Sequence, residues 1–301
     1  MGSASVTPPT VLRTLAAVRN LTPAEAGHGY RVQVRGIVTY SDTDPLVMSA
    51  QDFFLLGAHA GLYVKGPAGP HFKAGDQVQV VGRSATGEFA PVIKASQVRR
   101  LGHTPLPPAP LTTGAALVSG SEDAQWIRLQ GIVHQVIAAG SRTAVKLVVG
   151  NTLVHVLIAP SSRGLSASGG VGIGSLVTVF GVVKTLYNSQ RQNLGFEVWV
   201  PSFAEFHLDQ AGPPAPFALP LDDIAALVRF DPRGGSRRLW HVQGVVTLQS
   251  TARNELFVQS SSGGVYLPAP QAPTLRVGDL ADVVGFPVTS AGKPILSLIH
   301  I

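Results

Sequence analysis

Nucleophilic catalysis has one short motif of suitable spacing in this 301-residue chain. Ser290 and Lys293 stand three positions apart, as in enzymes that pair a serine nucleophile with a lysine. Such a pair begins a helix, whereas 290–293 lies between two predicted strands and has the composition of a hairpin turn. The chain has no cysteine and no G-x-S-x-G elbow. We therefore predict a turn at 290–293 and no enzymatic activity in this chain.

Phosphate-binding and metal-binding patterns are incomplete. The glycines of 169–174 are as dense as those of a phosphate loop, but they lack the Lys-Ser/Thr ending, and a strand follows instead of a helix. The nine histidines show no spacing that places two ligands on one helical face. Asp42 and Asp44 are too few for a calcium site, and a polar turn before Pro45 also explains them. We expect no metal ion and no cofactor.

Two pairs of aromatic residues are better placed for binding. Phe257 and Tyr266 each stand between two apolar residues of a predicted strand. Because successive side chains of a strand point to opposite faces, both rings should lie outside while their neighbours enter the core. Phe54 and Tyr63 repeat the arrangement earlier in the chain. Two interpretations remain open: contact with a ligand, and packing against a neighbouring part of the protein.

A polar loop between Leu186 and Phe196 is the third candidate. It places an aromatic ring, a cation and several amides in one short span, at Tyr187, Asn188, Arg191 and Gln192. Such groups give directional hydrogen bonds to a sugar or a carboxylate. A solvated hairpin tip explains the same residues. In the preceding strands of this region, His155 stands where the other copies have tyrosine, so we expect no aromatic pair there.

These candidates lie in three copies of one pattern. A first strand signature is followed by a second one that begins with a Gly-Asp or Gly-Ser turn; they read VRGIV (34–38) with GDQVQVVG (75–82), LQGIV (129–133) with GSLVTVFG (174–181), and VQGVV (242–246) with GDLADVVG (278–285). Their apolar and polar residues alternate as in strands. The glycine inside each first strand indicates a sharp bend.

Five short strands per copy predict a small closed barrel, because closure removes exposed sheet edges. In the first copy we expect strands at 31–40, 52–56, 61–65, 77–84 and 91–100. The fold class is thus all-β, with module 1 at 8–103, module 2 at 107–209 and module 3 at 213–301. Pro-rich linkers near 104–110 and 210–216 lead into short Ala/Leu segments that should form one or two helical turns.

Composition agrees with folded β-domains. Hydrophobic residues make up 45% and charged residues 13%, with 33 glycines and 23 prolines, which disfavours a disordered chain or a coiled coil. The longest uncharged stretch is too rich in glycine for a membrane helix, so this segment should not contact a membrane. The net charge is +6, but basic residues cluster only at Arg99–Arg100, Arg229 with Arg233, and Arg237–Arg238. We expect only weak binding of nucleic acid.

The VRGIV-type strand, the GDQVQVVG-type strand and the hairpin LFVQSSSGGVYL (256–267) resemble tandem OB-fold domains. The resemblance is specifically to OB-like sensory modules found outside the membrane in bacterial sensor histidine kinases. It implies three five-stranded OB-like barrels that bind through the face of the second and third strands. It also implies a periplasmic sensory region of a two-component system, with any kinase activity outside this chain.

The ligand is not specified by this pattern: a small molecule, an oligosaccharide and a protein all fit. The alternative is a cytoplasmic array of OB-folds that binds single-stranded nucleic acid. The final residues, LSLIHI, resemble translated sequencing-adaptor sequence, and Ile301 corresponds to Val98, a position inside the last strand of module 1. We expect the natural chain to continue, with a secretion signal before module 1 and a membrane helix after module 3.

Overall fold

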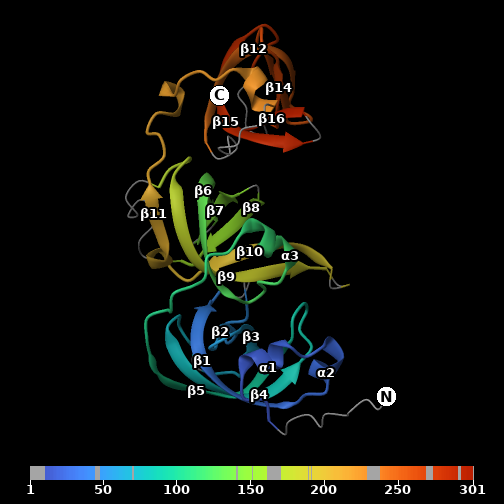
Figure 1. Cartoon of the computed structure of the whole chain (residues 1–301), viewed down its shortest axis with the longest axis vertical. Helices are drawn as coiled ribbons and strands as arrows, with labels where there is room; N and C mark the ends of the chain where they lie inside the picture. Colours follow the sequence, from blue (N-terminus) through green and yellow to red (C-terminus); the bar gives the residue numbers. More distant parts are fainter. Residues whose placement is uncertain are drawn as a thin grey trace, which may run out of the picture.

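Three β-barrels follow one another along the chain and are stacked along the longest axis of the molecule (Figure 1). The computed structural model describes residues 11–44, 48–69, 71–139, 142–150, 152–160, 171–188, 190, 192–228, 238–268, 274–290 and 293–300. Each barrel encloses its own core of buried aliphatic and aromatic side chains. The predicted all-β class with tandem OB-like barrels is confirmed.

Module 1 has the strand order of an OB fold. Its strands are β1 (Arg31–Ser41), β2 (Phe53–Leu56), β3 (Gly61–Lys65), β4 (Asp76–Ala85) and β5 (Val92–His103). They close in the order β1-β2-β3-β5-β4, with β3 and β5 parallel. The observed bounds agree with the expected strands to within a few residues.

Module 3 repeats this barrel. Its strands are β12 (Trp240–Ser250), β13 (Glu255–Gln259), β14 (Gly264–Pro268), β15 (Leu280–Ser290) and β16 (Lys293–His300), in the order β12-β13-β14-β16-β15. Ser290 pairs with Lys293 at the end of the β15–β16 hairpin, while residues 291–292 lie outside the described residues.

Module 2 departs from the expected five strands. It contains β6 (Trp126–Ala139), β7 (Arg142–Val149), β8 (Thr152–Ile158), β9 (Leu176–Tyr187), β10 (Asn193–Val200) and β11 (Phe206–Gln210). The ring closes because β9 pairs with both β6 and β10. β11 pairs with the first half of β9 and β10 with the second half, so the two strands together occupy the position of a single fifth strand. Pro201 and the 3-10 helix η2 (Phe203–Glu205) interrupt it, since proline cannot donate to the ladder.

The glycine inside each first strand permits a close approach of backbones. A Cβ added at Gly36 would lie 2.4 Å from the carbonyl oxygen of Leu56 on β2. A Cβ added at Gly82 on β4 would lie 2.2 Å from the carbonyl oxygen of Lys94 on β5. Both distances are shorter than any real Cβ contact, so these positions require glycine for the barrel to curve tightly.

The segments before the barrels form short helices, as expected. They are α1 (Leu15–Arg19), α3 (Gly114–Ser119) and the 3-10 helix η4 (Ile224–Val228). Leu15, Leu117 and Ile224 are buried in the three barrel cores, which shows that each helix covers its own barrel. A second helix in module 1, α2 (Pro23–Gly27), was not expected; Thr22 and Glu25 form a capping box at its start. No helix in the described part of the chain is long and apolar enough to span a membrane.

The two linkers differ in how firmly they are held. In the first, Leu106 and Ala109 join an apolar cluster shared by modules 1 and 2, and the Trp126 Nε1 donates a hydrogen bond to the carbonyl oxygen of Pro107 over 2.9 Å. In the second, residues 214–218 include the 3-10 helix η3 (Pro216–Ala218) and are mostly exposed. The second linker is therefore the weaker connection.

Limited proteolysis should cut first within 213–220 and separate module 3 from a fragment that contains modules 1 and 2, because exposed segments with few contacts are cleaved first. A protease that tolerates proline and mass spectrometry of the fragments are suitable. A first cut within 104–110 would contradict the tight joint between modules 1 and 2. A first cut within β4 would contradict the barrel itself.

Candidate functional site

Each barrel has a front face, which we define as three outward side chains at matched positions of its first three strands. In module 1 they are Tyr40, Phe54 and Tyr63, which are successive cross-strand partners. The same register gives Gln135, Lys146 and His155 in module 2, and Leu248, Phe257 and Tyr266 in module 3. The two predicted aromatic pairs thus occupy equivalent places.

The front face of module 1 is covered by module 2. Tyr40 and Phe54 are 0% and 1% exposed, and the Trp199 ring from β10 lies 5.3 Å from the Tyr40 ring and 6.0 Å from the Phe54 ring. Offset and edge-to-face contacts of this kind add about 0.5–1.5 kcal/mol each to the burial of the rings. Phe54 thus packs against the neighbouring module, which is the second of the two interpretations given above.

Beside this contact lies a small cavity of about 210 Å³ between the two modules. Lys184 of β9 extends between the rings of Tyr63 and Tyr187, with its Nζ 5.6 Å and 5.1 Å from their centroids. Tyr187 also stacks on Phe89 with nearly parallel rings. Burial and a hydrogen bond to Asp52 raise the pKa of Tyr63 well above its usual value, so it remains a neutral donor. The cavity is smaller than an ordinary small-molecule site.

An ion pair between the modules lies beside the aromatic contact. Arg142 of β7 pairs with Asp42 over 2.5 Å and with Asp44 over 3.4 Å, and it donates to the Tyr40 hydroxyl. Burial by itself would raise the pKa of Asp42, but hydrogen bonds from Arg142, the Asp44 amide and Tyr40 outweigh it and hold the pKa below its usual value. The two aspartates therefore hold module 2, and no cluster of metal-ligating side chains occurs among the described residues.

The amides of the predicted polar loop bind one another. Asn188 accepts hydrogen bonds from the backbone amides of Gln190 and Gln192, and its side chain donates to Gln192 Oε1 over 2.7 Å. These bonds organise the turn between β9 and β10. Arg191 lies outside the described residues. Tyr187 does not belong to this group of amides; its side chain lines the cavity beside Tyr63.

The front face of module 2 is polar, and the described contacts of module 2 with module 3 come from β6 and from Ile173, which precedes β9. Gln135 and His155 are exposed. Leu239, Val284 and Phe286 of module 3 form an apolar cluster with Ile132 and Ile173 of module 2.

One histidine lies inside this second joint. The rings of His134 on β6 and Phe286 on β15 have centroids 3.7 Å apart. Burial and, secondarily, the charge of Lys146 lower the pKa of His134 to about 4. His134 is therefore neutral at physiological pH while it packs against module 3.

The front face of module 3 is partly exposed, and neither of the other modules covers it in the described part of the chain. Phe257 is 38% and Leu248 45% exposed, and Phe257 lies 5.0 Å from the ring of Tyr266. Val245 and its cross-strand partner Leu280 extend the exposed apolar surface toward β15. The three modules thus differ in the exposure and polarity of their front faces: the matching side chains are buried in module 1, polar in module 2, and apolar and partly exposed in module 3.

A larger cleft of about 770 Å³ lies between module 1 and the first linker. Its apolar wall comes from Trp126, Leu101 and the linker prolines, and its polar groups include Arg35, His59 and Glu122. The size falls within the range of small-molecule sites.

Sequence reasoning missed the partners that cover module 1. Trp199, Lys184 and Arg142 lie more than 75 positions from the residues they contact in module 1. The available signal was the combination of a tryptophan in the fifth strand of module 2 with an otherwise aromatic face in module 1. The structure brings Phe54, Tyr63 and Tyr187 together around one cavity and places Phe257 with Tyr266 on another module.

No known protein family and no curated protein matches the chain. Among solved structures, it is similar to an OBody bound to hen egg-white lysozyme, with 15% identity, 35% of this chain and 100% of that chain covered, and a TM-score of 0.28. Asparaginyl-tRNA synthetase from Pyrococcus horikoshii shows 22% identity over 32% of this chain, with a TM-score of 0.26. The hypothetical protein ygiW from E. coli shows 16% identity over 30% of this chain and 89% of its own, with a TM-score of 0.24. The match covers only 22% of the synthetase.

Replacing Arg142 with methionine should lower the free energy of unfolding by about 3 kcal/mol, because Asp42 is then left buried without its partner. Urea unfolding monitored by tryptophan fluorescence measures the change. Arg128→Met, at an exposed position of β6, is the control and should be nearly neutral. Equal stability of the two variants would show that the ion pair does not hold the modules together.

Acid should loosen the joint between modules 2 and 3. The folded pKa of His134 lies below the unfolded value of about 6.5, so its neutral form stabilises the joint above pH 6.5, and this contribution is lost as the pH falls toward 4. NMR relaxation should show faster tumbling of module 3 at pH 4.5 than at pH 7.5. His134→Phe keeps a ring without titrating and should abolish the difference; a loss of docking at the same pH in this variant would reject His134 as the cause.

Proposed function

We propose that this chain is a non-enzymatic interaction region, and that it meets a protein partner through the front face of module 3. The observation that carries the proposal is the group formed by the exposed Leu248 and Phe257 and the half-buried Tyr266. At the same register positions of module 1, Tyr40, Phe54 and Tyr63 already hold another protein surface, that of module 2.

The chemistry of the patch supports a protein partner. Contiguous exposed apolar surface on a soluble domain marks an interaction site, and aromatic residues supply much of the binding energy at such sites. Val245 and Leu280 continue the patch with aliphatic side chains at 42% and 67% exposure. The surface that meets module 1 from the other side is likewise apolar, with Trp126, Val182 and Trp199.

The setting that we propose is the sensory region of a signal-transduction protein outside the cytoplasm. The resemblance of the three strand signatures to extracytoplasmic modules of sensor histidine kinases supports it. In this proposal the kinase lies elsewhere in the protein, and the three barrels carry the effect of partner binding toward it. A small molecule or an oligosaccharide on the same face is the alternative ligand.

Photocrosslinking tests the face directly. A benzophenone amino acid in place of Tyr266, in cells that express the full natural protein, should give one discrete protein adduct. Adding Leu248→Ala and Phe257→Ala should reduce the yield about tenfold or more, because each truncated contact costs about 1 kcal/mol or more of binding. Both positions are exposed, so circular dichroism should show unchanged folding.

The matched control carries the same probe at His155, the equivalent position of module 2, and should give no adduct. Equal adducts from both positions, or none from position 266, would contradict the proposed face. The purified chain can also be titrated with oligosaccharides and followed by NMR. Shifts in the signals of Phe257 and Tyr266 would indicate that the ligand of this face is a sugar and not a protein. A gene that encodes no secretion signal and stops directly after module 3 would contradict the sensory setting.

A further inference from the structure

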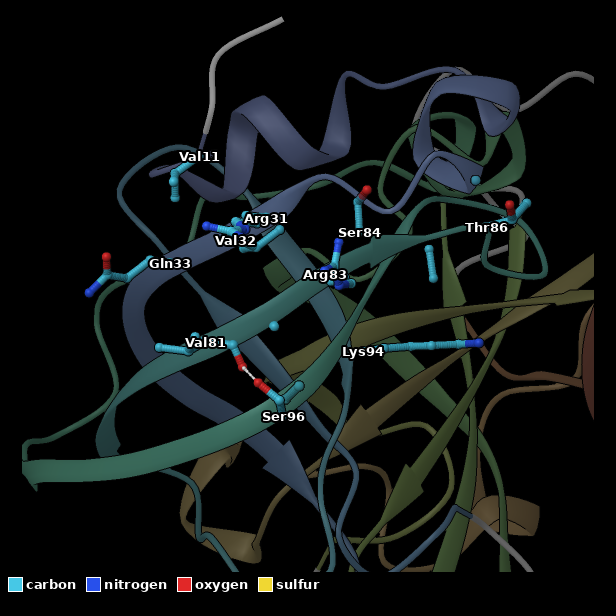
Figure 2. Close-up of a pocket in the computed structure, with 14 residues that line it drawn as sticks. Val11, Arg31, Val32, Gln33, Val81, Arg83, Ser84, Thr86, Lys94 and Ser96 are labelled. Atoms are coloured by element: carbon cyan, nitrogen blue, oxygen red, sulfur yellow. Dashed lines mark hydrogen bonds between the residues drawn. The ribbon is translucent and has the colours of Figure 1, made fainter.

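The outer surface of β1, β4 and β5 in module 1 carries a row of cations. Arg31 on β1 is the direct cross-strand partner of Arg83 on β4, and Arg83 is the direct partner of Lys94 on β5. All three side chains are exposed. Figure 2 shows them on three neighbouring strands, together with Gln33, Thr86 and Ser96. These six residues line one hollow of about 780 Å³.

A second row extends the positive surface four positions along β1 and β4. Arg35 and Arg99 both pair with Gln79, which separates them on β4. Arg99 and Arg13 are held by amides, because they donate hydrogen bonds to Gln79 and Gln33. Among the described residues, none of these six cations forms an ion pair with a carboxylate.

This arrangement costs folding free energy. Like charges directly opposite each other on neighbouring strands are destabilising. Arg83 donates to the carbonyl oxygen of Gly29, but that bond does not neutralise its charge. No described contact of Arg31 or Lys94 compensates the repulsion, so the row is suited to a negative charge brought by a partner.

The equivalent positions of the other modules make contacts between barrels. Module 2 has Trp126, Val182 and Trp199 there, which cover module 1. Module 3 has Leu239 and Phe286, which contact module 2. The surface is thus a docking position in this architecture, and in module 1 its chemistry changes from apolar to cationic.

The shape of the surface selects among polyanions. No aromatic side chain lines the hollow, whereas proteins that hold single-stranded nucleic acid stack its bases on aromatic rings. Double-stranded DNA is also a poor match, because proteins read it by inserting a protruding helix or β-ribbon into its groove, whereas this surface is concave. Cations separated by amides and hydroxyls match a chain that carries both acidic groups and many hydroxyls, and arginine binds carboxylate and sulfate groups in a directional way.

We propose that the cationic row Arg31, Arg83 and Lys94 binds an acidic polysaccharide, with the acidic groups on the cations and the sugar hydroxyls on Gln33, Thr86 and Ser96. This surface is distinct from the front face of module 3 and does not depend on the function proposed for it.

Fluorescence anisotropy with the full chain tests this site. The probes are labelled oligogalacturonate, for carboxylates, a heparin oligosaccharide, for sulfates, and a neutral oligosaccharide of the same length. We expect binding of one or both acidic probes that weakens as salt is raised, and no binding of the neutral one. The triple variant Arg31→Gln, Arg83→Gln, Lys94→Gln should bind the acidic probes about tenfold or more weakly.

The control is the triple variant Arg128→Gln, Arg253→Gln, Arg276→Gln, which removes the same charge from exposed positions of modules 2 and 3 and should bind as the unchanged chain does. The midpoint of thermal unfolding should rise by about 2 °C in the first variant, because repulsion is relieved, and not in the control. Equal loss of binding in both variants, or absence of binding to both acidic probes at about 0.15 M salt, would overturn the proposal. Tighter binding of a single-stranded oligonucleotide than of either acidic probe would also overturn it and assign the row to nucleic acid.

Discussion

The contact between Trp199 and the aromatic face of module 1 is the interaction on which the rest of the molecule depends. Each OB barrel can close around its own core, but Tyr40 and Phe54 point outward and would otherwise be exposed to water. The indole of Trp199 covers them, and this burial brings Arg142 within reach of Asp42 and Asp44. Because a buried ion pair stabilises only when its geometry is good and its groups are paired, the apolar contact is the condition for the charged one.

The joint also explains why module 2 differs from its neighbours. Its fifth strand is split at Pro201, directly after Trp199 and Val200 have completed β10. Glu205, which follows the break, lines a hollow together with Asp42 and Phe72 of module 1. The irregular strand thus lies at the surface that meets module 1, whereas the fifth strands of modules 1 and 3, β5 and β16, are continuous over their described residues.

Most of the fold could be predicted from the sequence, because the patterns that specify the strands lie within each copy of the repeat. Alternation of apolar and polar residues and the glycines at 36, 131 and 244 predict strands within one copy, and the observed strands of module 1 follow them closely. The site is less predictable because it depends on contacts between copies. Phe54 and Phe257 have the same local pattern and the same register, yet one is buried and the other exposed. The residues of module 2 that cover Phe54, above all Trp199, distinguish the two positions, and no local pattern encodes where those residues lie. The cationic row was missed for a similar reason: its members are dispersed in the sequence and become neighbours only through strand pairing.

The covered face of module 1 has a consequence for synthesis of the chain on the ribosome. Module 1 can fold as soon as its last strand, β5, has emerged, because its core contains only its own residues. Trp199 follows almost a hundred residues later, and at about 5–20 residues per second that interval lasts on the order of 5–20 s. During it, a folded barrel presents Tyr40 and Phe54 without their cover. Nascent chains on neighbouring ribosomes of one mRNA would expose this aromatic surface at the same time and could associate through it. Wide spacing of the ribosomes, or a chaperone that binds module 1 until module 2 has folded, would reduce such aggregation.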